Sequence, residues 1–90
     1  MADAEPYELH VTGPATRGLD RLTEGVAAAI VEFMVGALCD NPNRAGGPLL
    51  GEFAGQRSAR RGAYRIIYRI DEHTRGVIVN RIEHRSTSYR

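Results

Sequence analysis

The chain has 90 residues, of which 42% are hydrophobic and 26% are charged. This length allows one domain, expected over residues 1–90, and the hydrophobic fraction excludes an intrinsically disordered chain. The single cysteine, Cys39, excludes an internal disulfide and is typical of the reducing cytosol, so we expect a cytoplasmic protein. The longest apolar run, residues 26–31, is too short to span a bilayer, and no signal peptide is recognisable at the start. We therefore expect no membrane partner.

The formal net charge of +1 conceals an uneven distribution of charge between two parts of the chain. Residues 1–56 carry three arginines and eight acidic residues, a net charge of −5, whereas residues 57–90 carry nine arginines and three acidic residues, a net charge of +6. The sequence contains no lysine, so every basic side chain is a guanidinium, whose planar fork suits phosphate. Such an asymmetry favours a polyanionic partner for the second part.

The first half of the chain predicts a strand followed by two helices. Residues 1–6 form a loose leader, and the alternation of apolar and polar residues over 7–12 predicts a half-buried strand that ends at Gly13-Pro14. A helix should then run from Pro14 to about residue 22, and a second from a Thr23 N-cap to about residue 40. The second helix is indicated by apolar residues at helical spacing: Val26, Ala27, Ile30, Val31, Met34, Val35 and Leu38.

The second half predicts a loop and three strands. Residues 41–51 are rich in proline and glycine, and strands are expected over 52–59, 64–70 and 77–83, followed by a polar tail at 84–90. Their short connections make an antiparallel meander. The predicted fold is therefore α+β, in the order β-α-α-β-β-β, with an antiparallel sheet and a helical hairpin packed on one face. The other face should stay open to solvent or to a ligand.

The middle strand separates apolar from basic side chains. Every second residue from Tyr64 to Ile70 is apolar and should meet the helices, whereas Arg65, Ile67 and Arg69 point the other way. Neighbouring strands add more guanidiniums to the uncovered face: Arg57, Arg60 or Arg61 from one side, and Arg81 and Arg85 from the other. We expect this face to bind phosphate groups. Charge alone does not distinguish RNA from DNA or from an acidic protein.

The C-terminal tail carries residues that could cut RNA: His84, Arg85 and Tyr89. RNA can be cleaved without a metal when a base takes the 2′-hydroxyl proton, cations stabilise the charge on phosphorus and an acid protonates the leaving oxygen. The scattered histidines and the lone cysteine give no metal-ligand spacing, and no phosphate-binding glycine loop occurs. We therefore expect neither a metal nor a cofactor.

Two segments together resemble the RelE family of toxins. Residues 55–71, GQRSARRGAYRIIYRID, are similar to the family signature, in which a glycine-bounded turn is followed by Tyr-Arg, two aliphatic residues and Tyr. Residues 84–89, HRSTSY, resemble the basic residue and the tyrosine with which the family ends. The strand and the helical hairpin over residues 7–40 have the family's order and lengths, so the resemblance covers residues 7–90. The arginine-rich form looks closest to actinobacterial members.

The resemblance implies a toxin of a type II toxin–antitoxin system that cuts mRNA in the ribosomal A site without a metal and is neutralised by a cognate antitoxin. It implies that Arg65 stabilises the scissile phosphate, that Arg85 is a second catalytic arginine acting as general acid, and that Tyr89 is a base or a base-stacking platform. Because lysine is absent, His84 is expected to supply titratable chemistry. The expected RNA-binding residues, from the resemblance and the strand faces together, are Arg57, Arg60, Arg61, Arg69 and Arg81.

Two other functions are compatible with the same scaffold. A ParE-like toxin inhibits DNA gyrase by binding and cuts nothing, and a basic binding module would hold an antitoxin or a nucleic acid without chemistry. The short helical hairpin and the closing Tyr89 favour the endoribonuclease over the ParE-like toxin, since ParE-like chains have a longer hairpin and lack the tyrosine.

Overall fold

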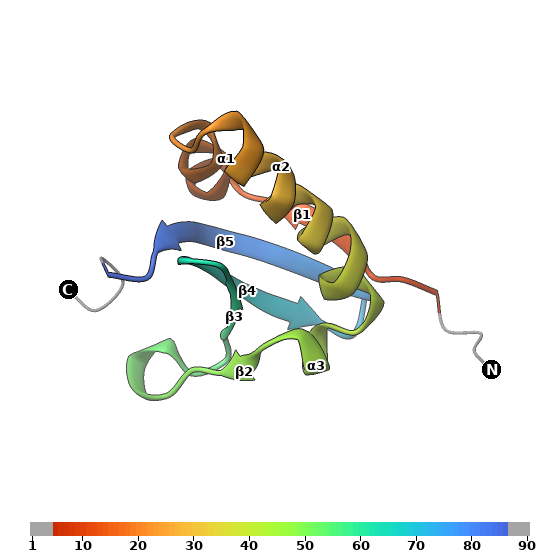
Figure 1. Ribbon diagram of the computed structural model, residues 1–90. Helices are drawn as coiled ribbons and strands as arrows, with labels where there is room; N and C mark the ends of the chain where they lie inside the picture. The colour runs from red at the N-terminus through yellow and green to blue at the C-terminus, as the bar shows by residue number, and fades with distance from the viewer. Residues whose placement is uncertain (1–4, 87–90) are drawn as a thin grey trace.

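The computed structural model describes residues 5–86 and contains a five-stranded sheet with helices α1 and α2 on one face (Figure 1). The strand order is β1-β5-β4-β3-β2. The elements in chain order are β1 (Glu8–Val11), α1 (Gly13–Asp20), α2 (Glu24–Phe33), the π-helical turn η1 (Met34–Leu38), α3 (Pro42–Ala45), β2 (Gly47–Pro48), the 3-10 turn η2 (Gly51–Phe53), β3 (Arg57–Arg61), β4 (Tyr64–Asp71) and β5 (Gly76–His84).

The two predicted helices are both present. The side-chain oxygen of Thr12 caps α1 by accepting a hydrogen bond from the Ala15 backbone N–H at 3.4 Å, and Pro14 lies in the first turn. Thr23 has the extended backbone of an N-cap but makes no side-chain capping bond to α2. The helix that follows ends in the wider turn η1. In the described part of the chain, no helix is long and apolar enough to cross a membrane.

The core lies between the helices and one face of the sheet. The apolar side of β4 is confirmed, since Ile66 and Tyr68 are fully buried in the core and Tyr64 and Ile70 pack against it. Helix α1 crosses β5 very closely, because a Cβ atom on Gly18 would lie 2.5 Å from the Ile82 carbonyl oxygen. The other buried members of this core are Ala15, Ile30, Met34, Leu38, Ala59, Val77, Val79 and Ile82.

Two parts of the structure differ from the sequence prediction. Strands β3, β4 and β5 form the expected antiparallel meander, but β1 pairs with β5 in parallel. A parallel partner is possible because a long connection, from the helical hairpin to β4, separates the two strands in sequence. The strand expected from residue 52 begins only at Arg57, after α3, β2 and η2. Gly51 and Gly55 have φ of 68° and 97°, in the left-handed region, so this segment cannot continue as a strand.

Candidate nucleic-acid interface

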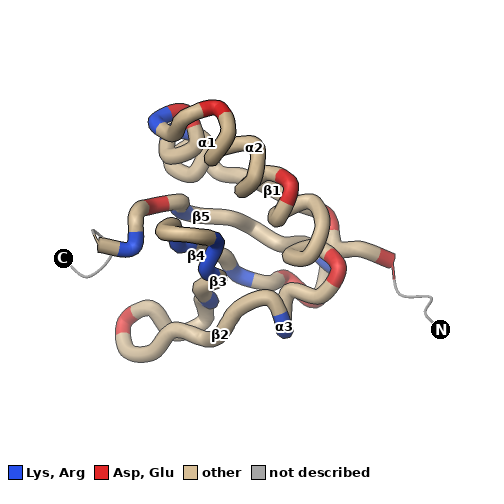
Figure 2. The backbone as a smooth tube through the Cα atoms, in the orientation of Figure 1, with Lys and Arg blue, Asp and Glu red and all other residues tan. Residues whose placement is uncertain are grey.

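The sheet face opposite α1 and α2 brings arginines from three adjacent strands together. Residues paired directly across a ladder share a face, with Cβ atoms about 5 Å apart. The register therefore forms one row from Arg60, Arg65 and Glu83, and a neighbouring row from Ser58, Ile67 and Arg81. We call Arg60, Arg65 and Arg81 the basic cluster. Figure 2 shows arginine segments gathered on β3, β4 and β5, whereas acidic segments lie along the N-terminal half.

The members of the basic cluster differ in how firmly their surroundings hold them. Arg65 is half-buried in the central strand, whereas Arg60 is exposed and the Arg81 side chain is 66% exposed. Arg69 lies on the same face, opposite Ile78, but about 13 Å further along β4 from Arg65. The face thus has a dense basic end and a single arginine towards its other end.

Glu83 lies inside the basic end of this face and was given no role from the sequence. Its carboxylate Oε2 is 3.9 Å from Arg81 Nε, and its side chain is 24% exposed. Simple alternation along the sequence does not predict the side of the sheet on which Glu83 lies, because β5 contains a β-bulge. Arg81 pairs with Ile67 and Val79 with Tyr68, so Asn80 is an extra residue. After this extra residue, the odd-numbered residues of β5 face the open side of the sheet and no longer the helix side. Strict period-two counting from Val77 would place Arg81 and Glu83 on the helix side.

Two of the three arginines of β3 lie on the helix side of the sheet. Arg57 is paired with Tyr68 and Arg61 with Tyr64, both of which belong to the apolar side of β4. The expectation that Arg57 and Arg61 join Arg60 on the open face is therefore wrong, because alternate residues of one strand face opposite ways. Arg61 is exposed and lines a pocket of about 410 Å³ between α2 and the β3–β4 turn.

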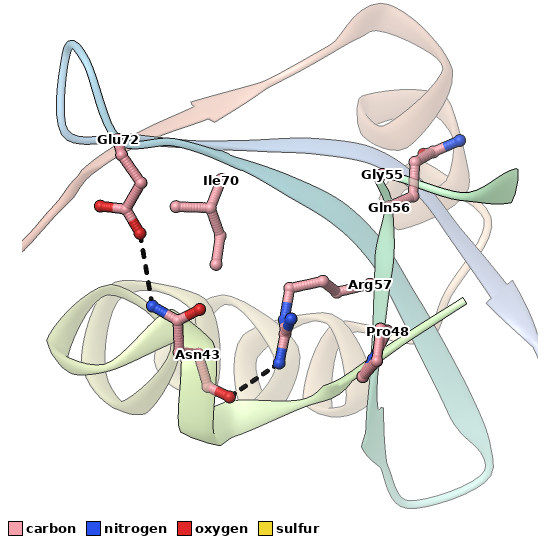
Figure 3. A pocket seen from close by; sticks show the side chains of 7 residues that line it. All are labelled: Asn43, Pro48, Gly55, Gln56, Arg57, Ile70 and Glu72. Carbon is pink, nitrogen blue, oxygen red and sulfur yellow. Dashed lines mark hydrogen bonds between the residues drawn. The ribbon is translucent and has the colours of Figure 1, made fainter. Parts of the chain in front are cut away.

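Arg57 holds α3 against the sheet. Its guanidinium Nη2 donates to the carbonyl oxygens of Asn43 and Gly46, each at 2.8 Å, and the first of these bonds is drawn in Figure 3. The Tyr68 hydroxyl donates to the Pro42 carbonyl at 2.6 Å, and burial raises the pKa of Tyr68 while the nearby Arg57 lowers it in part. Three carbonyls of one segment are thus satisfied by side chains of the helix-side sheet face.

A pocket of about 270 Å³ lies beside Arg57 on this helix side (Figure 3). Glu72 at its rim accepts hydrogen bonds from the Tyr7 hydroxyl at 2.7 Å and the Asn43 amide at 3.4 Å. Arg57 Nε is buried and has no hydrogen-bond partner among the described residues. The polar groups of the pocket join α3 and the N-terminal segment to the sheet. Its lining is Asn43, Pro48, Gly55, Gln56, Arg57, Ile70 and Glu72.

The predicted catalytic residues near the C-terminus are only partly brought together. His84 is paired with Tyr64, and the two rings meet edge to face with centroids 5.3 Å apart, so His84 lies on the helix side and not beside Arg65. The Ser86 backbone N–H donates to His84 Nδ1 at 3.2 Å. Arg85 donates its backbone N–H to Ala63 at 2.9 Å, at the same end of the sheet as the basic cluster. Tyr89 lies outside the described residues.

Residues 5–86 contain no three His, Cys, Asp or Glu side chains placed to share a metal ion. Around the basic cluster, the open face offers guanidiniums, the Glu83 carboxylate, the Ser58 hydroxyl and apolar side chains, whereas Glu8, His10 and Asp71 lie at the other end of this face. Such a surface can bind and polarise phosphate groups.

Comparison with known proteins identifies the family. A family model described as the ParE toxin of type II toxin–antitoxin systems, parDE, matches residues 9–89. The chain is 48% identical to the toxin RelE of Mycobacterium tuberculosis over 90 residues, which cover 100% of this chain and 93% of the relative. It is 46% identical to the toxin RelG of the same organism over 85 residues, which cover 94% of this chain and 98% of that relative.

A solved structure agrees with these relatives. The crystal structure of the toxin–antitoxin complex RelBE2 from Mycobacterium tuberculosis contains a chain that superposes with a TM-score of 0.86 at 46% identity. The match covers 90% of this chain and 93% of that chain. Family model, relatives and structure all describe toxins, and the resemblance of residues 55–71 and 84–89 to the RelE family is confirmed. This chain therefore belongs to the ParE toxin family of type II toxin–antitoxin systems and is a toxin of the RelE type.

Proposed function

We propose that this toxin is a metal-independent endoribonuclease that cleaves mRNA in the ribosomal A site and thereby stops translation. The observation that carries the proposal is the basic cluster, Arg60, Arg65 and Arg81, on a sheet face that the helices leave uncovered. Guanidiniums packed this closely repel one another, and a bound phosphate relieves that repulsion. The naming of the two mycobacterial relatives as RelE and RelG supports the same activity.

In this proposal the half-buried Arg65 donates hydrogen bonds to the scissile phosphate, where negative charge increases during the reaction. Arg60, Arg81 and Arg69 bind phosphates along the strand. Arg85 and Tyr89 keep the catalytic roles that the family resemblance implies, as general acid and as base or stacking platform. The geometry argues against direct roles for Arg57, Arg61 and His84, whose register positions are on the helix side.

The chain's second candidate function is gyrase inhibition, which the description of the matching family model as ParE toxin supports. The two functions make different demands on the basic face. Cleavage requires Arg65 to act on a phosphate at a fixed position, whereas inhibition by binding requires only a complementary surface. Names and fold do not separate the two, so a direct assay is needed.

The experiment adds purified protein to translating ribosomes on a defined mRNA and, in parallel, to a gyrase supercoiling reaction. We expect cleavage within the A-site codon, with a 5′-hydroxyl on the downstream fragment, and unchanged supercoiling. Intact mRNA together with inhibited supercoiling would mean that the chain is a ParE-like gyrase inhibitor. If neither activity appears, the chain is a binding module only.

We also propose that an acidic antitoxin segment covers the basic face. The related RelBE2 structure is a toxin–antitoxin complex, and residues 57–90 of this chain carry a net charge of +6. Salt screens the attraction between opposite charges, so the affinity for the cognate antitoxin should fall as ionic strength rises. Affinity that does not change with salt would count against this arrangement.

A further inference from the structure

We propose that Glu83 is the general base of the reaction and takes the proton from the attacking 2′-hydroxyl. The proposal rests on the endoribonuclease function above, limits Tyr89 to the role of a stacking platform, and adds a catalytic residue that neither the sequence signature nor the comparisons point to. Its starting point is the register, which places the Glu83 carboxylate directly across the ladder from Arg65, with Cβ atoms about 5 Å apart. A phosphate bound by Arg65 therefore has this carboxylate beside it.

The chemistry of the face leaves few other proton acceptors. The arginine side chains are protonated before the reaction and so cannot accept a proton, and the other side chains around the basic cluster are a hydroxyl, aliphatic groups and the amides of Gln56 and Asn80, which are hydrogen-bonded to each other. Among the described residues beside the basic cluster, Glu83 alone carries an anionic oxygen that can accept a proton. The other titratable acceptors that the register places on this face are at its far end, around Gly76 and Ile78: Glu8, His10 and Asp71.

A structural role for Glu83 explains its position poorly. Its contact with Arg81 is long, at 3.9 Å, and the Arg81 side chain is 66% exposed, so water and salt screen the pair. A negative charge within the basic cluster also opposes the binding of phosphate. Glu83 relieves part of the repulsion among the guanidiniums around it, and a carboxylate directly across from Arg65 can in addition accept a proton from the RNA.

The step balances without a metal or a redox partner. Glu83 accepts the 2′-hydroxyl proton while the 2′-oxygen forms a bond to phosphorus, and the bond from phosphorus to the 5′-oxygen breaks. The leaving 5′-oxygen takes a proton from the general acid, which is Arg85 in the proposal above, and Arg85 regains a proton from solvent. The products are a 2′,3′-cyclic phosphate and a 5′-hydroxyl end, and Glu83 returns its proton to solvent.

The test is Glu83→Gln, which keeps the shape of the side chain and removes its basicity. We expect single-turnover cleavage on the ribosome to fall by about 10²-fold or more, as the loss of a general base typically does. Binding of an uncleavable 2′-deoxy RNA should stay equal or become tighter, because a repulsive charge is gone. The acidic limb of the pH–rate profile should disappear in the variant. Glu32→Gln is the matched control, because it removes one exposed negative charge from α2.

Three outcomes would overturn the proposal. Cleavage by Glu83→Gln within about threefold of wild type would exclude a catalytic base at this position. Parallel loss of cleavage and RNA binding, with circular dichroism unchanged, would assign Glu83 to the interface alone. An equal loss in Arg81→Gln, with no further loss in the double variant, would mean that Glu83 acts only by positioning Arg81. If the wild-type protein itself leaves mRNA intact, it is the endoribonuclease function that fails.

Discussion

The two faces of the sheet separate the buried core from an arginine-rich surface. The helix side of β4 buries Ile66 and Tyr68 completely, whereas the open side carries Arg65 and Arg69. Because successive side chains of a strand point to opposite faces, one eight-residue strand can supply the centre of the core and the centre of the interface together. The lesson is that substitutions one residue apart on this strand should have separable effects, on folding at one position and on RNA at the next.

Strand β3 shows the same division between two residues of one kind. Arg57 donates to Asn43 and Gly46 on the helix side, whereas Arg60 lies in the row with Arg65 and Glu83 on the open side. Composition and local charge do not separate these two arginines. Only the pairing with β4 assigns one of them to α3 and the other to the basic cluster.

The largest expected effect on folding is that of Ile66→Ala. The side chain has no exposed surface and lies in the middle of the core, so its truncation should lower the free energy of unfolding by roughly 2–4 kcal/mol. Urea denaturation followed by circular dichroism measures this loss. The cleavage rate per folded molecule should stay at the wild-type value, and a reduced rate in fully folded protein would show that the two faces are coupled.

Arg65→Ala should produce the converse result. We expect cleavage to fall by about 10²-fold or more, as the loss of one charge-stabilising donor typically causes, while the unfolding transition changes little. Single-turnover kinetics on programmed ribosomes and a urea titration of the same sample provide both numbers. Arg44→Ala is the matched control, because it removes one exposed positive charge from α3. An unfolded Arg65→Ala protein would contradict the separation of the faces.

The pair Arg57→Ala and Arg60→Ala sharpens the comparison within β3. Loss of the Arg57 guanidinium leaves two carbonyls without their donor, so stability should fall by about 1–3 kcal/mol. Arg60→Ala should leave stability unchanged but reduce the salt dependence of single-stranded RNA binding, by about 0.7 in the log–log slope for one phosphate contact. Denaturation and binding titrations at several salt concentrations measure the two effects. The reverse pattern would mean that the register of β3 is wrong.

The smallest expected effect concerns pH. Burial raises the pKa of Tyr68 above its ordinary value of 10.0, so the folded state favours the neutral phenol. The resulting stability is fully present below pH 10.0 and is lost as the pH rises through the raised value. In Tyr68→Phe, this part of the alkaline decline should be missing from urea denaturation curves collected at increasing pH. An unchanged alkaline slope would show that Tyr68 does not titrate with unfolding.

Much of the molecule follows from short-range patterns in the chain. The helical spacing of apolar residues after Thr23 predicted α2 and its continuation, and strict alternation from Tyr64 predicted which side of β4 is buried. The charge asymmetry and the motifs at residues 55–71 and 84–89 indicated the family. These features succeed because each is determined within a few residues, by the periods of the helix and the strand.

What the sequence left open depends on contacts between distant segments. The parallel pairing of β1 with β5, the helix-side positions of Arg57 and His84, and the role open to Glu83 all follow from strand register. A pattern of period two gives the two faces of one strand but does not say which residues of the neighbouring strands share each face, and the bulge at Asn80 exchanges the two faces within β5. The sequence by itself determined the elements, the positive charge and the family. Only the tertiary structure decided which charges share a surface, because pairing across strands, and not order along the chain, sets that arrangement.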